Sequence, residues 1–141
     1  LINLAYKNKC INSNKIHFVH NNEAEMIKLF RNTFLSTKIS FCNEIYHFCQ
    51  SQNISYENVR KLAANDPRIG SSHTNVPGHD GFFGYGGTCF PKDINSLYFQ
   101  MKEKNLNSYI IKATVERNEN VDRPQQDWKS NVNRAVIQEE E

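Results

Sequence analysis

The stretch EAEMIKLFRNTFLSTKISFCNEIYHFCQS, residues 23–51, contains neither glycine nor proline and sets the architecture of the whole chain. Asn22 is suited to cap a helix, Glu25 three residues later completes a capping box, and Glu23 suits the positive end of the helix dipole. Apolar residues follow at spacings of three, four and seven, which is typical of an amphipathic helix: Ile27, Phe30, Phe34, Phe41, Ile45, Phe48 and Cys49. We therefore predict one helix over residues 23–51.

Further apolar residues widen this stripe beyond one face of the helix: Met26, Leu29, Leu35, Ile39, Cys42 and Tyr46. At 1.5 Å per residue, a helix of about 28 residues is about 42 Å long, more than a compact domain of this size needs. A long helix that is apolar on more than one face requires an additional partner surface. We predict that it packs against a second copy of itself and makes the protein a homodimer.

Three shorter helices are predicted at residues 54–64, 91 to about 104 and 108 to about 120. Asp66-Pro67 ends the first of them, because the residue before a proline disfavours helical conformation, and Arg123-Pro124 interrupts the last. The side chains expected to face the core are Ile54, Val59, Leu62, Ile94, Leu97, Tyr98, Met101, Ile110, Ile111, Ala113, Thr114 and Val115. The predicted fold is all-α, a multi-helical domain built on the long helix at about 23–51.

The first twenty residues carry the weakest pattern. Lys15–Val19 alternates as a short strand would, with Ile16 and Phe18 on one face, but a lone strand has no partner in a helical chain. We predict that residues 1–20 form an N-terminal arm or the remnant of a preceding domain. Residues 21–122 would form the helical domain, and residues 123–141 a C-terminal linker or tail.

The composition is that of an ordinary globular protein, with 141 residues, 38% of them hydrophobic, and a formal charge of +2. Basic residues are interleaved with acidic ones, so no basic face indicates a nucleic-acid partner. No apolar run approaches the roughly 20 residues of a membrane span, and no signal-peptide pattern occurs. The four cysteines show no framework of a small secreted domain. We expect a reduced, cytoplasmic compartment, and neither membrane nor nucleic acid as a partner.

A glycine-rich stretch, GYGGTCFPKD at residues 84–93, carries the residues most suited to chemistry. All six glycines of the chain lie between residues 70 and 87, and a backbone without Cβ atoms lets a ligand approach closely. Pro91 is well placed to open a helix, which would put Cys89 at a helix N-terminus, where the dipole favours a thiolate. Asp93 would follow roughly one turn later. We interpret residues 66–93 as an active-site loop.

Lys28 and Asn32 share a face of the long helix one turn apart, either as a solvated stripe or as part of a site.

Cys42 and Cys49 share another face of the long helix, from which His47 points away. This spacing favours buried thiols over a zinc site.

The histidines near the glycine-rich stretch leave two further alternatives. A metal bound by Cys89 with His73 or His79 is disfavoured, because the gaps are irregular and no second cysteine is near. A cysteine–histidine hydrolase that uses Cys89 with one of these histidines is the weaker enzymatic alternative.

Three motifs resemble, in order, those of the UDP-glucose/GDP-mannose dehydrogenase family. Residues 23–35 (EAEMIKLFRNTFL) resemble the start of its central helical domain, residues 66–70 (DPRIG) its RIG turn, and residues 84–93 its G-G-x-C-F-P-K-D motif. Arg123-Pro124 with Asp127-Trp128 is similar to the segment that leaves this domain in some members. The resemblance covers roughly residues 20–130. It implies a dimer-forming domain like the C-terminal helical domain of 6-phosphogluconate dehydrogenase.

The resemblance also implies an activity: oxidation of the 6-hydroxyl of a nucleotide sugar to a carboxylate in two NAD-dependent steps, through a thiohemiacetal and a thioester. Cys89 would be the nucleophile, with Asp93 and Lys28 handling protons and Asn32 binding the reacting oxygens. Lys92 would reach the NAD cofactor. The substrate would be held by Arg68 from the neighbouring subunit and by Gly78, His79, Asp80, Gly81, Phe82 and Gly86.

The sequence departs from the family pattern in two respects, because the family places an NAD-binding domain before this region and a nucleotide-binding domain after it, and we expect neither in this chain. A dinucleotide-binding turn needs closely spaced glycines after a strand, and residues 1–69 contain no glycine. We therefore expect the central, dimer-forming domain of a nucleotide-sugar 6-dehydrogenase that does not turn over alone. The alternative is a non-catalytic dimerisation or interaction module derived from that family.

Overall fold

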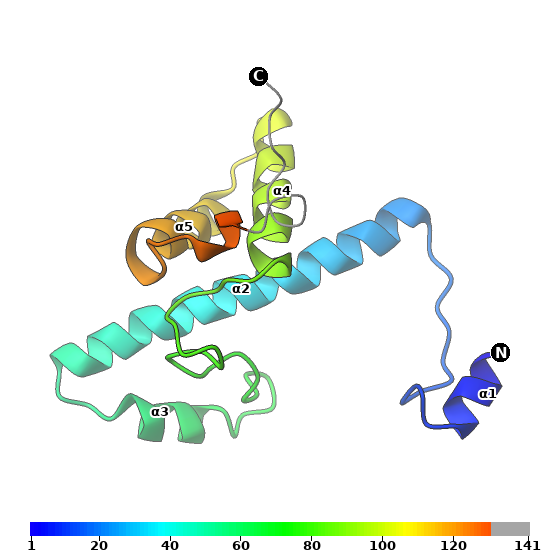
Figure 1. The fold of residues 1–141 in the computed structure, drawn as a ribbon, viewed down its shortest axis with the longest axis horizontal. Helices are drawn as coiled ribbons and strands as arrows, with labels where there is room; N and C mark the ends of the chain where they lie inside the picture. The colour runs from blue at the N-terminus through cyan, green and yellow to red at the C-terminus, as the bar shows by residue number, and fades with distance from the viewer. Residues whose placement is uncertain (131–141) are drawn as a thin grey trace.

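The structure is a computed structural model that describes residues 1–130, and within that range every regular element is a helix (Figure 1). In chain order the elements are α1 (Ile2–Lys7), α2 (Asn21–Ser51), α3 (Tyr56–Ala63), α4 (Cys89–Glu103), α5 (Tyr109–Arg117), the π-helical turn η1 (Asn118–Asp122) and the 3-10 turn η2 (Asp127–Ser130). The all-α prediction is confirmed for residues 1–130. Residues 131–141 of the predicted tail lie outside the described residues.

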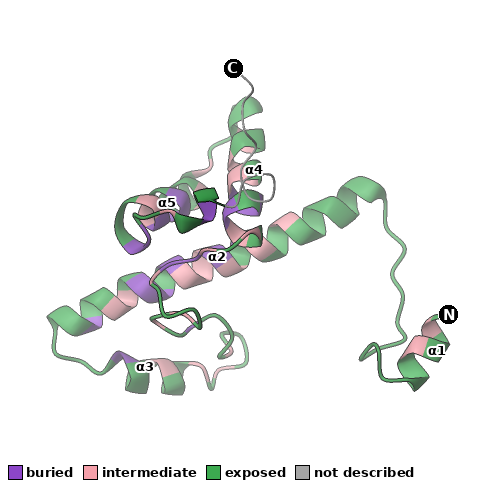
Figure 2. Cartoon of the chain, in the orientation of Figure 1, coloured by how far each residue is buried: buried purple, intermediate pink, exposed green. Residues whose placement is uncertain are grey.

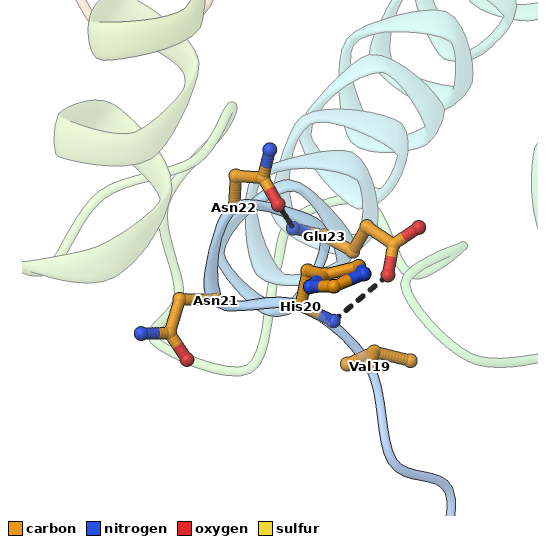
Figure 3. A pocket seen from close by; sticks show the side chains of 5 residues that line it. All are labelled: Val19, His20, Asn21, Asn22 and Glu23. Carbon is orange, nitrogen blue, oxygen red and sulfur yellow. Dashed lines mark hydrogen bonds between the residues drawn. The ribbon is translucent and has the colours of Figure 1, made fainter.

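α2 is the spine of the molecule, with α4 and α5 on one side and α3 with the loop after it on the other (Figure 1). It ends at Ser51 as predicted but begins two residues early, at Asn21. The Glu23 carboxylate accepts from the His20 N–H at 2.9 Å, and Asn22 Oδ1 accepts from the Glu23 N–H at 3.0 Å (Figure 3). The predicted cap of Asn22 with Glu25 is wrong, because Glu23 already closes the first turn.

The face of α2 that the rest of the chain covers consists of small and mostly polar side chains. Its buried residues are Thr33, Ser36, Ser40, Cys42, Asn43 and Cys49. Ser36 and Asn43 donate to carbonyl groups one turn back, at 2.8 Å in both cases, so these donors have partners inside the helix. Small side chains let the shorter helices come close to α2, and the predicted apolar stripe mostly faces outward instead.

Two small clusters fix α3, α4 and α5 to this spine, and Figure 2 shows the buried residues gathered where these helices meet. Tyr85, Ile94 and Val115 form one between α2, α4 and α5, while Cys42, Cys49 and Tyr56 form the other between α2 and α3. The prediction that Cys42 and Cys49 are buried thiols is confirmed.

The predicted inward face of α3 is wrong. Ile54, Val59 and Leu62 are exposed, because the helix is anchored at its first turn by Tyr56. The Tyr56 hydroxyl donates to the Thr74 carbonyl at 2.7 Å, and this bond ties α3 to the following loop. α3 is therefore held by one buried aromatic residue, Tyr56, and not by the predicted stripe of three apolar residues.

α4 and α5 follow the predicted order but bury fewer side chains than expected. Ile94, Thr114 and Val115 are buried, Leu97, Tyr98, Met101 and Ile111 are half-buried, and Ile110 and Ala113 are exposed. α5 stops at Arg117 and continues as the π-helical turn η1, so the predicted helix to residue 120 changes its winding three residues early.

The N-terminal arm contains α1 and an extended segment that leads to α2 (Figure 1). None of residues 1–20 is buried. Residues 15–19, whose alternation resembles that of a strand, form no strand, since no neighbouring strand in the described range offers backbone partners. Among the helices of residues 1–130, none combines the length and apolarity required to cross a membrane.

Candidate active site

Cys89 is the first residue of α4, and its thiol is free and exposed. The predicted position at a helix N-terminus is therefore confirmed, although the helix begins at Cys89 and not at Pro91. Pro91 is buried within the first turn, where its missing N–H costs no helical hydrogen bond.

Asp93 lies one turn beyond Cys89 and is the centre of a charged cluster. Its side chain is 1% exposed. Asn32 Nδ2 donates to Asp93 Oδ2 at 2.5 Å, and the ammonium group of Lys28 lies 3.7 Å from the same oxygen. Lys92 donates to the other carboxylate oxygen, Oδ1. The structure thus brings Lys28 and Asn32 of α2 together with Lys92 and Asp93 of α4, which lie about sixty positions later in the chain.

The electrostatics of this cluster keep Asp93 ionised. Burial alone raises the pKa of the Asp93 carboxyl, but the hydrogen bonds from Lys92 and Asn32 and the charges of Lys92 and Lys28 outweigh it. The pKa is consequently lower than that of an ordinary aspartate. An ionised carboxylate accepts only, so Asp93 orients donors and does not itself donate.

A pocket of about 670 Å³ adjoins the start of α4. Gly87 and Phe90, which flank the Thr88-Cys89 pair in the chain, contribute to its wall. The predicted substrate residues Gly78, His79, Asp80, Phe82 and Gly86 also line it, together with Ile39, His73, Asn75, Gly84, Tyr85, Arg123 and Asp127. Five of the seven predicted substrate residues therefore share one cavity.

Residues 78–82 form a tight turn at the rim of this pocket. The Gly78 N–H donates to the Phe82 carbonyl at 2.8 Å, and the Gly81 N–H donates to the Gly78 carbonyl at 3.0 Å. Gly81 has a φ of +81°, a conformation that other residues rarely adopt. Gly81 itself shapes the turn and is not among the lining residues.

Arg68 is not brought to this pocket. It lies on an exposed turn, and its Nη2 pairs with Asp66 Oδ2 at 2.5 Å. Lys38 fixes the same turn to α2 by donating to the carbonyl groups of Ile69 and Gly70 at 2.8 and 3.2 Å. The predicted contact of Arg68 with a substrate in the neighbouring subunit remains a prediction.

Two asparagines that sequence reasoning missed hold the glycine-rich stretch in place. Asn43 Oδ1 on α2 accepts from the Gly84 N–H at 3.2 Å. Asn118 on η1 accepts from the Tyr85 N–H at 2.8 Å and donates to the Tyr85 carbonyl at 3.0 Å. Because both amides are buried, they replace water as partners of this irregular backbone.

Arg123 is a third residue that was missed as part of the site. It is 3% exposed and lines the pocket between Asp80 and Asp127. Burial alone raises the pKa of the Asp80 carboxyl, but the hydrogen bond from Arg123 brings it below the usual value, and the same guanidinium lowers the pKa of Asp127. The sequence signals for this group are the four-residue spacing of Arg123 and Asp127 and the similarity of this segment to the one that leaves the domain in some family members.

The two histidines of the loop line the pocket but do not activate the thiol in this structure. His73 shares a hydrogen bond with Ser72, and its ring meets the edge of Phe90 at 5.6 Å between centroids. Within residues 1–130, no hydrogen bond joins the Cys89 thiol to His73 or His79, and no cluster of three or more metal-ligating side chains occurs.

The described residues do not fit a dinucleotide cofactor by themselves. Residues 1–69 lack glycine, and no strand precedes a glycine turn within residues 1–130. Lys92 pairs with Asp93 in this structure, and its predicted contact with NAD remains a prediction. Fold and site together define a helical domain with a thiol at a helix start and a buried, ionised aspartate one turn beyond it.

Comparison with known proteins places this domain. The family model "UDP-glucose/GDP-mannose dehydrogenase family, central domain" matches residues 22–120. The UDP-glucose 6-dehydrogenase of Pseudomonas aeruginosa is 37% identical over 107 residues, 76% of this chain and 22% of that protein. Those of Campylobacter jejuni and Rickettsia bellii are 36% identical over 104 residues and 38% over 95, covering 74% and 67% of this chain.

The chain therefore belongs to the UDP-glucose/GDP-mannose dehydrogenase family. It spans between a fifth and a quarter of the length of these curated relatives, 21% to 25%.

Proposed function

We propose that this chain provides the thiol site of an NAD-dependent nucleotide-sugar 6-dehydrogenase that acts on UDP-glucose or on a related sugar such as GDP-mannose. One observation carries the proposal: α2 supplies Lys28 and Asn32 to the buried carboxylate of Asp93, one turn beyond Cys89. Cys89 and Asp93 are four residues apart in α4 and therefore lie on the same face of that helix. The donors that contact Asp93 thus lie on the side of α4 that bears the thiol.

The first thiol step is addition to the C6 aldehyde of the sugar. The Cys89 thiolate forms a sulfur–carbon bond, the carbonyl π electrons move to oxygen, and that oxygen takes a proton to give a thiohemiacetal. The Lys28 ammonium and the Asn32 amide are the donors available to stabilise the developing negative charge. Lys28 is 60% exposed, so it can exchange protons with solvent.

The second thiol step is hydrolysis of a thioester. Water adds at C6, the tetrahedral adduct breaks its sulfur–carbon bond, and the thiolate and the carboxylic acid are released. In both steps Asp93 holds Lys28 and Asn32 at the turn of α4 that follows the thiol. Conversion of thiohemiacetal to thioester removes a hydride, and the described residues fit no dinucleotide. We therefore assign this chain the thiol steps alone and expect no NAD reduction by the 141-residue polypeptide.

Calorimetry with UDP-glucose, UDP-glucuronate and GDP-mannose tests whether this chain binds a nucleotide sugar. We expect saturable binding of at least one of them, weakened in Lys28→Met and unchanged in the control Lys112→Met, whose lysine lies on α5. Flat traces for all three ligands would favour the non-catalytic interaction module.

The thiol chemistry has a separate test that needs no cofactor. UDP-glucose oxidised to the C6 aldehyde and labelled with ¹³C at C6 should show a thiohemiacetal signal on mixing with the protein. Cys89→Ala should abolish the signal, while Cys10→Ala, which removes another exposed free thiol, should leave it. A signal that survives Cys89→Ala would contradict the assignment of the nucleophile.

We also propose that α2 pairs with the α2 of a second copy. Four phenylalanines of the predicted stripe remain 58% to 66% exposed: Phe30, Phe34, Phe41 and Phe48. Phe30 and Phe34 also line a groove of about 460 Å³ with apolar residues of α4 and α5, among them Leu97 and Met101. A contiguous apolar surface of this kind is typical of an interface between proteins.

A further inference from the structure

Arg123 links three parts of the pocket wall, although it lies outside the residues 22–120 that the family model matches. Its Nη1 donates to Asp80 Oδ2 at 2.7 Å, within the turn at residues 78–82. Its Nε and Nη2 donate to the two oxygens of Asp127 at 2.5 and 2.8 Å. Its Cζ lies 5.0 Å from the centroid of the Phe82 ring, a distance suited to a cation–π contact.

The guanidinium also lies against the backbone of Gly86. A Cβ atom added at Gly86 would lie 2.4 Å from Arg123 Cζ and 2.6 Å from Nη2, closer than any real contact. Glycine at this position therefore makes room for the arginine. Because Gly86 and Asp80 belong to separate segments of the pocket wall, the guanidinium sits between them as a spacer.

We propose that Arg123 is a positioning residue that holds the 78–82 turn and Gly86 apart at a fixed distance and so sets the width of the pocket. The function depends on the planar fork of the guanidinium, which donates in two directions at once, and not on positive charge alone. The two carboxylates that it binds leave no net positive charge for an anionic ligand. Arg123 has this role in the free protein, whether or not a nucleotide sugar is the ligand.

Arg123→Lys tests the requirement for the fork, because lysine retains the charge and loses the planar donors. The readout is amide hydrogen exchange at Gly78 and Gly81, whose N–H groups close the turn. We expect exchange there to accelerate about tenfold or more, the consequence of losing hydrogen bonds between charged groups, while amides in the middle of α2 keep their rates.

Arg117→Lys is the matched control. Arg117 also pairs with two carboxylates, those of Glu44 and Asp122, but it does not line this pocket. Unchanged exchange at Gly78 and Gly81 in Arg123→Lys would overturn the proposal, as would equal acceleration in Arg117→Lys or throughout α2. If Arg123→Lys does not fold, Asp80→Asn cuts the link to the turn alone, and the same two amides decide the question.

A second measurement tests the spacer directly. Gly86→Ala should accelerate exchange at Gly78 and Gly81 in the wild-type background, because the new methyl group displaces the guanidinium from Asp80. In an Arg123→Ala background, the same substitution should add less than about a threefold change, since the colliding group is gone. Independent, additive effects would contradict the proposal. Loss of nucleotide-sugar binding with these exchange results intact would count against the proposed function only.

Discussion

The side-chain amide of Asn118 closes a ring of two hydrogen bonds with the backbone of Tyr85, accepting from its N–H at 2.8 Å and donating to its carbonyl at 3.0 Å. The pair resembles a step of β-ladder in a chain whose described part otherwise uses helices. These two hydrogen bonds join η1 to the glycine-rich stretch before Cys89. A turn late in the chain therefore positions the loop that carries the thiol.

Asn118→Ala should destabilise the protein by about 2–4 kcal/mol, because two buried backbone groups of Tyr85 lose their partners. Asn95→Ala is the control, since Asn95 donates at 2.9 Å only to the Pro91 carbonyl of its own helix and should cost less than about 1 kcal/mol. Urea denaturation measures both. Equal costs would show that the Asn118 pair is not important for stability.

Gly84→Ala should be more costly than Gly70→Ala by about 1–3 kcal/mol. Both glycines have φ near +65°, so each substitution carries a similar backbone strain. A Cβ at Gly84 would lie 2.2 Å from Asn118 Oδ1, whereas a Cβ at Gly70 has no atom within 4 Å. The difference between the two free energies of unfolding thus isolates the steric overlap with Asn118. A difference near zero would mean that the loop shifts freely.

Asp93 should make stability fall in acid. Its pKa is lower in the folded protein than the value of about 3.9 expected in the unfolded chain. The stabilisation is therefore fully present above about pH 4 and is lost as pH falls through the folded pKa. Asp93→Asn should reduce the free energy of unfolding by about 1–3 kcal/mol at pH 7. Below about pH 3 the wild-type carboxylate itself becomes protonated, so the difference in free energy of unfolding between the two proteins should become smaller. A difference independent of pH between 2 and 7 would contradict this.

Phe34→Glu with Phe41→Glu should weaken self-association at least about tenfold if α2 pairs with a second α2, because each buried phenylalanine contributes about 1.5–3 kcal/mol. Phe99→Glu is the control, since Phe99 is 60% exposed on α4, as Phe34 and Phe41 are on α2. Sedimentation at several protein concentrations measures the change. A wild-type monomer at high concentration, or an equal effect of Phe99→Glu, would contradict the proposed interface.

The order and approximate extent of the major helices could be predicted from the sequence because glycine and proline are concentrated in one segment. Asp66-Pro67 and the glycines after it separate the helical flanks, and local periodicity supplies the rest. Which face of α2 is buried against the rest of the chain could not be predicted. Apolar spacing identifies a stripe but not its partner, and in this chain Ser36 and Ser40 face inward while Phe34 and Phe41 face outward.

Part of the candidate site was predictable and part was not. Cys89, Asp93, Lys28 and Asn32 were found because a motif and a resemblance marked them, and the structure brings the last three together. Asn43, Asn118 and Arg123 were missed as site residues. Asn43 and Asn118 bind backbone groups far along the chain, and Arg123 binds Asp80, 43 positions away, so no local spacing encodes these pairs. The Arg123–Asp127 pair does have a local spacing, but that spacing does not show that the pair lies in a pocket.

The small, polar face of α2 has a thermodynamic consequence. Unfolding exposes little apolar surface when serine, threonine and asparagine fill the contacts, so the heat-capacity change should lie below about 12 cal/mol/K per residue. A small heat-capacity change flattens the curve of stability against temperature. If the outward phenylalanines of α2 are covered by association, the melting temperature will also rise with protein concentration, and stability will depend on how much of the protein is present.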